Sequence, residues 1–150
     1  MKKIILLLLI SFLLSAKSLN PLLQSPHIVQ KRSKNSYYTT IKKLKYIIKK
    51  KGFKIIAAID HTKMAKSVKV RIDPAYLIIF GNPKVGAKLM KLDVRAGLDL
   101  PMRILVFRLK GKTYISYHKP IELLRYYHLQ KRLLLQMDKV LDQISDYARK

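Results

Sequence analysis

The stretch LIIFGNPKVGAKLM, residues 77–90, decides the fold of this 150-residue chain. It completes the apolar run Tyr76–Phe80, which is too continuous for a strand with one solvated face, so we expect a central strand of a sheet. Gly81-Asn82-Pro83 then breaks this strand, and Pro83 suits the first turn of a helix that runs to about Leu92. The side chains expected on the inward face of that helix are Val85, Leu89 and Leu92.

Downstream of this stretch the sequence predicts a hairpin followed by helices. Leu98–Pro101 leads into a strand over Met102–Leu109, and the tight turn Lys110-Gly111-Lys112 returns the chain into a strand over Thr113–Tyr117. Pro120 opens a short helix, and a longer helix follows it. The expected buried face of the longer helix is Leu133, Met137, Val140, Leu141, Ile144 and Ala148.

Upstream of the stretch the sequence predicts a helix between two strands. Tyr37–Thr39 is predicted as a short strand, after which Thr39 or Thr40 can cap a helix that ends at Lys51-Gly52. Phe53–Ile59 is predicted as a strand, and Thr62–Val68 as a short helix. The apolar stripe of the first helix consists of Ile41, Leu44, Ile47 and Ile48.

Together these elements predict one α+β domain over residues 37–150. Its sheet has about five strands, and we expect the first and last helices to cover one face of that sheet. The length leaves room for a single modest core.

Several segments carry a resemblance to a known family. They read IDHTKMA from Ile59, LIIFGNPKVGAKLM from Leu77, GLDLPMRILV from Gly97 and YISYHKP from Tyr114. From about Tyr37 to about Asp142 the chain resembles the bacterial domain-of-unknown-function 302 family. The resemblance implies a fold related to the TATA-binding-protein-like group, with a curved, mainly antiparallel sheet and helices packed in its concavity. It implies no activity. The family usually has a Gly in the turn where this chain reads Lys66-Ser67-Val68.

Residues 1–18 have the three parts of a cleavable signal peptide. A positive start is followed by the apolar run Ile4–Leu14, and the small residues Ala16 and Ser18 suit cleavage after either of them. The apolar run is shorter than the ~20 residues that a membrane-spanning helix needs, although an uncleaved anchor is the alternative. We therefore expect export to the periplasm or beyond. Residues 19–36, with two prolines and a basic run, are interpreted as a flexible lead-in.

The charge of the chain is strongly positive. It has 32 basic and 8 acidic residues, which gives a net charge of +24. Cleavage of residues 1–18 removes three lysines, so the mature chain has 29 basic and 8 acidic residues and a net charge of +21. Such a field attracts polyanions, anionic membrane surfaces and acidic partners, and export argues against nucleic acid as the natural partner. Of the 32 basic residues, 24 are Lys, which binds phosphate less specifically than Arg does. Compositional drift is therefore the alternative to a functional cationic surface. The absence of cysteine excludes thiol nucleophiles, disulfides and thiolate metal sites.

Six polar residues at predicted strand ends form a candidate binding rim. Asn82 follows the central strand and Asp99 precedes the next one, so antiparallel pairing places both at one edge of the sheet. The hairpin returns Tyr117 and His118 to that edge. Asp60-His61 joins them if its strand runs parallel to the central strand in space. Carboxylates, an amide and imidazoles above an apolar sheet are the mix that a polar ligand pocket needs.

Each rim residue also has a structural interpretation. Asp60 and His61 can cap the short helix, Asn82 can cap the helix that Pro83 opens, and the Asp99 carboxylate can bind backbone amides. His118 can simply lie at the surface. Asp138, Asp142 and Asp146 form an acidic stripe, which is interpreted as a solvated face that balances the charge of nearby lysines. Four scattered histidines lack the spacing of metal ligands, so no metal or cofactor is predicted.

Three functions stay open at this point. The absence of a recognisable catalytic motif favours a non-catalytic periplasmic module that binds a small ligand or a partner. The second hypothesis is an enzyme in which Asp60 or Asp99 orients His61 as a general base. The third is a cationic protein that associates with anionic lipid or other envelope polyanions.

Overall fold

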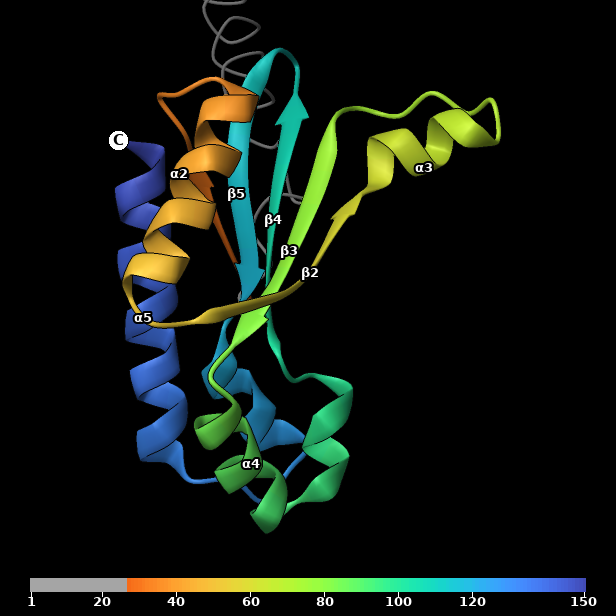
Figure 1. Ribbon diagram of the computed structural model, residues 1–150. Coiled ribbons are helices and arrows are strands. Elements are labelled where there is room, and N and C mark those ends of the chain that lie inside the picture. Colours follow the sequence, from red (N-terminus) through yellow and green to blue (C-terminus); the bar gives the residue numbers. More distant parts are fainter. Residues whose placement is uncertain (1–26) are drawn as a thin grey trace, which may run out of the picture.

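One five-stranded antiparallel sheet organises residues 27–150, the part of the chain that the computed structural model describes (Figure 1). The strand order is β1-β5-β4-β3-β2, and every neighbouring pair is antiparallel. This confirms the predicted α+β class and the strand number. The strands are β1 (Ile28–Arg32), β2 (Lys54–Asp60), β3 (Ala75–Gly81), β4 (Met102–Leu109) and β5 (Lys112–His118).

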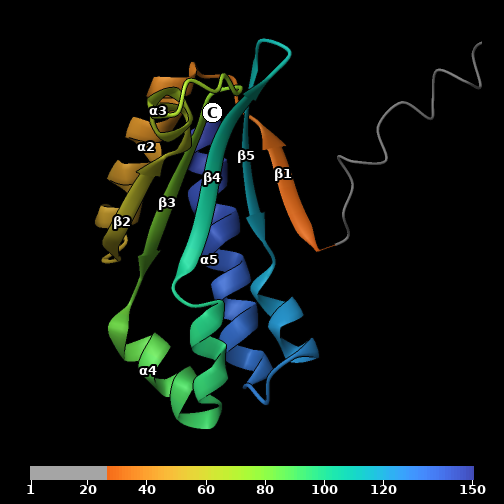
Figure 2. The same cartoon turned by 90° about the vertical axis from the view of Figure 1, so that its right-hand side faces the viewer.

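The two long helices cover one face of the sheet, as predicted. They are α2 (Tyr37–Lys50) and α5 (Lys131–Arg149). Figure 2 looks onto the other face, where the strands lie in front of both helices. The shorter helices α3 (His61–Ser67) and α4 (Pro83–Leu92) lie at opposite ends of the sheet (Figure 1). Two 3-10 helices, η3 (Val94–Leu98) and η4 (Pro120–Arg125), lie at the α4 end.

The core lies between the sheet and the two long helices. Side chains alternate along a strand, so Met102, Ile104 and Val106 of β4 point into the core while Arg103 is exposed. The facing side chains come from the stripes predicted for the two helices, and they include Leu44, Ile48, Leu141, Ile144 and Ala148.

The stretch that decides the fold forms the predicted elements. β3 lies between β4 and β2, and Ile78 and Phe80 are fully buried. Asn82 caps α4, which starts at Pro83 and ends at Leu92. The predicted burial of Leu92 is wrong, because its side chain is 47% exposed at the end of the helix. The chain then continues into η3, which was not predicted from the sequence.

The β4–β5 hairpin has the predicted tight turn. Leu109 pairs with Lys112, so the turn contains two residues, Lys110 and Gly111, with φ of 48° and 75°. Positive φ at both central positions is the conformation of a type I′ turn, whose twist matches that of the strands it joins.

The N-terminal part of the described chain corrects two predictions. Residues 28–32, which we interpreted as flexible lead-in, form edge strand β1, and Ile28 pairs with His118 of β5. Tyr37–Thr39 is not a strand but the first turn of α2, because the Ser36 hydroxyl accepts a hydrogen bond from the backbone N–H of Thr39 at 3.2 Å. The predicted signal peptide and residues 19–26 lie outside the described residues.

Membrane-spanning helices are absent from the described part of the chain. None of the helices in residues 27–150 is both long enough and apolar enough to cross a bilayer.

Candidate functional site

The α4 end of the sheet gathers four of the six candidate rim residues. Phe80 pairs with Met102, so the residues after β3 and before β4, Asn82 and Asp99, lie at the same end. Leu105 pairs with Ser116, which brings Tyr117 and His118 of β5 to that end as well. This part of the predicted arrangement is confirmed.

Asp60 and His61 lie at the opposite end of the sheet. β2 runs antiparallel to β3, with Lys54 opposite Gly81 and Asp60 opposite Tyr76. The Asp60 carboxylate accepts a hydrogen bond from the backbone N–H of Lys63 at 2.9 Å and caps α3. The prediction of one shared rim is therefore wrong for these two residues, because it required β2 and β3 to run parallel.

A polar cavity of about 610 Å³ lies at the α4 end, beside η4. Three candidate residues, Asp99, Tyr117 and His118, line it. The same cavity is lined by charged or titratable residues that the sequence analysis did not select: His27, Arg103, Lys119, Glu122, Arg125 and Tyr126.

The two carboxylates of the polar cavity are already engaged by protein groups. Tyr127 donates a hydrogen bond from its hydroxyl to Asp99 at 2.7 Å, and Arg103 donates to the same carboxylate at 3.2 Å. Glu122 lies 2.9 Å from His27 Nδ1 and 2.6 Å from Arg125 Nε. The predicted bonds from backbone amides to Asp99 are thus replaced by side-chain bonds.

These contacts shift the pKa values of the groups around the polar cavity. The hydrogen bond to Asp99 raises the pKa of Tyr127. Desolvation acts to raise the pKa of Glu122, but the hydrogen bond from His27 and the charge of Arg125 outweigh it, so this pKa is lowered. Both carboxylates therefore act as structural ties between segments of this end.

A second cavity, the apolar cavity, has a volume of about 690 Å³ and lies between α4, α5 and the start of β4. Asn82 is the one candidate rim residue that lines it. Among the lining residues, polar side chains come from Asn82 and Gln136 alone, and the rest are apolar residues, Gly and Pro. The apolar side chains include Phe53, Val85, Met90, Met102, Met137 and Val140.

The two cavities are neighbours. Leu100, Met102 and Met137 line both of them. Met102 and Met137 are 7% and 8% exposed, so they form a packed boundary between a polar compartment and an apolar one. Methionine side chains have three rotatable bonds and a polarisable sulfur, which lets such a boundary adapt its shape.

Gly86 is an unusual residue in the wall of the apolar cavity. It lies inside α4, where glycine costs about 0.5–1 kcal/mol relative to Ala. A Cβ atom at this position would meet no atom within 4 Å. The absence of a side chain therefore keeps space open along the helix face that borders the cavity.

Asp93 ties η3, which follows α4, to the loop before α5, and it was not among the predicted site residues. Its carboxylate accepts hydrogen bonds from Arg95 Nε at 3.0 Å and Nη2 at 2.8 Å, and from the backbone N–H of Arg95 at 3.1 Å. It also accepts one from the backbone N–H of His128 at 3.4 Å. The Arg95 side chain holds the pKa of Asp93 down at about 2. This buried carboxylate thus joins η3 to the loop that precedes α5.

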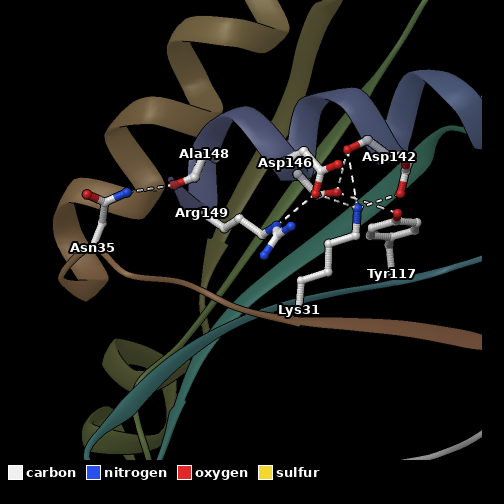
Figure 3. Close-up of polar contacts among 8 residues, drawn as sticks. Lys31, Asn35, Tyr117, Asp142, Asp146, Ala148 and Arg149 are labelled. Carbon is white, nitrogen blue, oxygen red and sulfur yellow. Dashed lines mark hydrogen bonds and ion pairs between the residues drawn. The ribbon is translucent and has the colours of Figure 1, made fainter.

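The acidic stripe of α5 serves to hold β1. Figure 3 shows Lys31 of β1 reaching Asp142 and Asp146, while Arg149 reaches Asp146 from the same helix. For Asp142 and Asp146, the interpretation that the stripe balances the charge of nearby lysines agrees with the structure. Asp138 differs, because one of its carboxylate oxygens is buried without a partner and burial raises its pKa. Within residues 27–150 no cluster of three or more metal-ligating side chains occurs.

Comparison with known proteins gives a family and a fold. The model of a family described as "Domain of unknown function DUF302" matches residues 29–149. A crystal structure of an uncharacterised conserved DUF302 protein from Bacillus stearothermophilus superposes with a TM-score of 0.74 at 19% sequence identity. The match covers 83% of this chain and 100% of that one. The crystallised relative therefore consists of this domain alone.

Curated relatives with a longer chain match in one segment. Proteins named fluoride-specific ion channel FluC 1 from Brucella suis and FluC 2 from Brucella melitensis are each 34% identical over 94 residues. These residues are 62% of this chain but 37% and 35% of the two relatives. The chain thus matches about a third of their length.

Proposed function

Since the chain belongs to the DUF302 family, whose description assigns no activity, we propose a function from its own site: it is an exported, non-catalytic module that binds an apolar small molecule in the apolar cavity. The proposal refines the ligand-binding hypothesis of the sequence analysis. It places the ligand beside Asn82 rather than among the acidic and imidazole groups of the rim.

The observation that carries the proposal is the size and lining of the apolar cavity. Its volume of about 690 Å³ falls within the ~300–1,000 Å³ of small-molecule sites, which are mostly apolar with a few polar groups that fix orientation. Apolar side chains supply the driving force for a ligand that leaves water. The amides of Asn82 and Gln136 are the side-chain groups available to orient a polar substituent on it.

The arrangement of the acidic and imidazole groups favours binding over catalysis. The catalytic hypothesis has Asp60 or Asp99 orient His61 as a general base, but Asp99 and His61 lie at opposite ends of the sheet. The Asp60 carboxylate is occupied as the cap of α3. In the polar cavity, Asp99 and Glu122 are each bound by neighbouring side chains.

The Brucella relatives support a domain that can be combined with other modules, because the matching segment is about a third of each protein. We do not propose fluoride, which appears in the names of these relatives, as the ligand of the apolar cavity. A small anion needs hydrogen-bond donors or cations around it, and the lining offers two side-chain amides among apolar groups.

A substitution that fills the cavity tests the proposal. A Cβ atom at Gly86 meets no atom within 4 Å, so the side chain of Gly86→Leu starts in open space at the wall, and Leu favours the helix over Gly by roughly 0.5–1 kcal/mol. We expect the variant to fold at least as stably as the wild type. Titration with the neutral fluorescent probe N-phenyl-1-naphthylamine should show binding to the wild type and at least about tenfold weaker binding to Gly86→Leu.

The control is Lys88→Leu, which adds the same side chain to an exposed position of α4 that does not line the cavity. It should bind the probe as the wild type does. Equal probe binding by wild type and Gly86→Leu would contradict the proposed site.

Export is tested by the N-terminus of the protein that accumulates in cells. Cleavage after Ser18 leaves Leu19 as the first residue, and cleavage after Ala16 leaves Lys17. Mass spectrometry of the chain from the envelope fraction should find one of these ends. An intact residue 1–18 segment on all of the protein would rule out the cleaved, exported form.

A further inference from the structure

A protruding arm formed by residues 61–74, which comprise α3 and the loop after it, carries exposed apolar and cationic side chains together. We propose that this arm docks onto an anionic lipid bilayer and inserts its apolar side chains among the head groups. The arm lies at the end of the sheet opposite α4 (Figure 1). The inference is therefore independent of the proposed ligand site.

The apolar side chains of the arm are uncovered in the described structure. None of the residues of α3 is buried. Met64 and Val68 are 60% and 68% exposed, and Val70 and Ile72 are 52% and 43% exposed. Single exposed apolar residues are ordinary, but four of them within nine positions of one projecting segment mark an interaction surface.

Cationic side chains alternate with these apolar ones. The segment 63–72 reads KMAKSVKVRI, in which Lys63, Lys66, Lys69 and Arg71 are all exposed. Asp73 is the one acidic residue of the arm, so four positive charges face one negative charge. Among the ion pairs formed within residues 27–150, none involves a residue of the arm.

This combination favours an anionic bilayer over other partners. Lipid head groups with negative charge attract nearby Lys and Arg side chains, and apolar side chains gain further free energy by entering the boundary of the acyl chains. A purely polar polyanion would use the cations and leave the four apolar side chains in water.

The arm is held in one shape, which lowers the entropy lost on docking. At its base, Thr62 Oγ1 accepts a hydrogen bond from the backbone N–H of Ala75 at 2.9 Å. At its tip, the backbone N–H groups of Lys69 and Val70 bond to the carbonyls of Lys66 and Ala65 at 3.0 and 2.9 Å. Lys69 takes a φ of 61°, a conformation that usually selects Gly. This position keeps a cation at the end of the helix.

The η3 segment at the other end of the molecule provides a matched comparison. Val94 and Leu98 are 71% and 79% exposed, more than the apolar residues of the arm. Met90 and Leu92 nearby are also 38% and 47% exposed, and Lys91 between them is exposed. However, Arg95 is paired with Asp93 at 2.8 Å. Lys91 is therefore the one cation outside an ion pair within Met90–Leu98, whereas the arm has three within Met64–Ile72. The exposure of single apolar side chains therefore does not distinguish the two ends, and the number of free cations does.

A tryptophan reporter tests insertion directly, since the chain contains no tryptophan. The protein used is residues 19–150, which contain all the described residues and the family match at residues 29–149. We expect the emission of Val70→Trp to shift to shorter wavelength on addition of vesicles made of phosphatidylglycerol and phosphatidylcholine in equal parts. Val94→Trp should show no shift, and phosphatidylcholine vesicles should shift neither variant.

Vesicle sedimentation at roughly physiological salt, where long-range charge attraction is screened, gives the second measurement. We expect Val68→Ser/Val70→Ser/Ile72→Ser to bind the anionic vesicles about tenfold more weakly than the wild type. Val94→Ser/Leu98→Ser should bind them as the wild type does.

Three outcomes would overturn the inference. The first is an unshifted Val70→Trp emission, or an equal shift in Val94→Trp. The second is unchanged vesicle binding by Val68→Ser/Val70→Ser/Ile72→Ser, which would indicate attraction by overall charge, or an equal loss of binding in the two serine variants, which would show no preference for the arm. The third is a Val70→Trp shift that grows with protein concentration without vesicles, which would assign the arm to contact between copies of the chain.

Discussion

Asp93 shows how a single residue holds the cavity-bearing end of the domain in place. Its carboxylate binds the Arg95 side chain and the backbone of both Arg95 and His128. These bonds connect η3 to the loop before α5, and both segments lie at the end where the two cavities are found. The stability of this end should therefore depend on the ionised form of one carboxylate.

The pKa of Asp93 sets a specific pH dependence. The hydrogen bonds from Arg95 lower it from the ordinary 3.8 to about 2 in the folded protein. A lowered folded-state pKa contributes stability that is fully present above the unfolded value and is lost as the pH falls through the folded value. Asp93→Asn should thus be less stable than the wild type at pH 7, and this difference should shrink between about pH 4 and about pH 2.

Urea denaturation at several pH values measures this difference. Asp73→Asn, which removes an exposed carboxylate of the arm, is the control and should show a much smaller effect. A stability loss in Asp93→Asn that stays the same from neutral to acidic pH would contradict the role of the ionised carboxylate.

Lys69 gives a second prediction for a single residue. Its φ of 61° lies in the left-handed region, which costs a side-chain-bearing residue roughly 1 kcal/mol. Lys69→Gly should therefore raise the free energy of unfolding by about 0.5–1 kcal/mol, as measured by thermal or urea denaturation. Lys66→Gly, inside α3, should lower it by a similar amount. A destabilised Lys69→Gly would show that the turn gains more from the lysine than it loses in backbone strain.

Residue roles could be predicted from sequence where the partner is close along the chain. The capping interpretations of Asp60 and Asn82 agree with the structure, because each bonds to a backbone N–H two or three positions away. The bonds from Tyr127 to Asp99 and from His128 to Asp93 span 28 and 35 positions. No local pattern indicates such pairs, so the bond from His128 to Asp93 could not be predicted, although the bonds of Asp93 to Arg95 span two positions.

At the scale of elements, β1 depends on side-chain contacts with α5. β1 pairs with β5 alone in the sheet. Lys31 is 15% exposed and reaches the Asp142 and Asp146 carboxylates. Burial acts to lower the pKa of Lys31, but the hydrogen bonds to these two carboxylates outweigh it, so the pKa is raised. The ion pairs of Lys31 with these two carboxylates compensate for the lack of a second strand partner for β1.

Lys31→Met should therefore loosen β1. The substitution keeps an unbranched apolar side chain but removes the charge, which leaves two carboxylates of α5 unpaired by β1. We expect a loss of about 1 kcal/mol in the free energy of unfolding, with faster amide hydrogen exchange in Ile28–Arg32. Lys34→Met, at an exposed position, is the matched control. Unchanged exchange in β1 would show that backbone pairing with β5 is sufficient.

The elements that could be predicted are those with a clear period or strong end signals. β4 was predicted with its observed bounds, and α4 begins at Pro83 and ends at Leu92 as expected. β1 was missed because IVQKR has little apolar alternation and is stabilised by contacts about 85 positions away. Tyr37 was assigned to a strand because of its aromatic neighbours, whereas the Ser36 cap starts a helix there.

At the scale of the whole molecule, the sheet separates two surfaces with different chemistry. The α4 end holds the apolar cavity, and the opposite end carries the arm (Figure 1). The fold class was predictable from the order of the elements. The direction of β2 relative to β3 could not be predicted, and this direction places His61 and Asp99 at opposite ends of the sheet. The apolar cavity also escaped prediction, because its lining residues range from Phe53 to Val140 and look like ordinary core residues.

Methionine methyl groups allow one measurement to test the proposed ligand site directly. Residues 19–150 contain four methionines: Met90, Met102 and Met137 line the apolar cavity, and Met64 lies on the arm. In a ¹³C-methyl-methionine NMR titration with N-phenyl-1-naphthylamine, we predict shifts of Met90, Met102 and Met137 and no shift of Met64. Shifts confined to Met64, or equal small shifts of all four methyl groups, would contradict a ligand site in the apolar cavity.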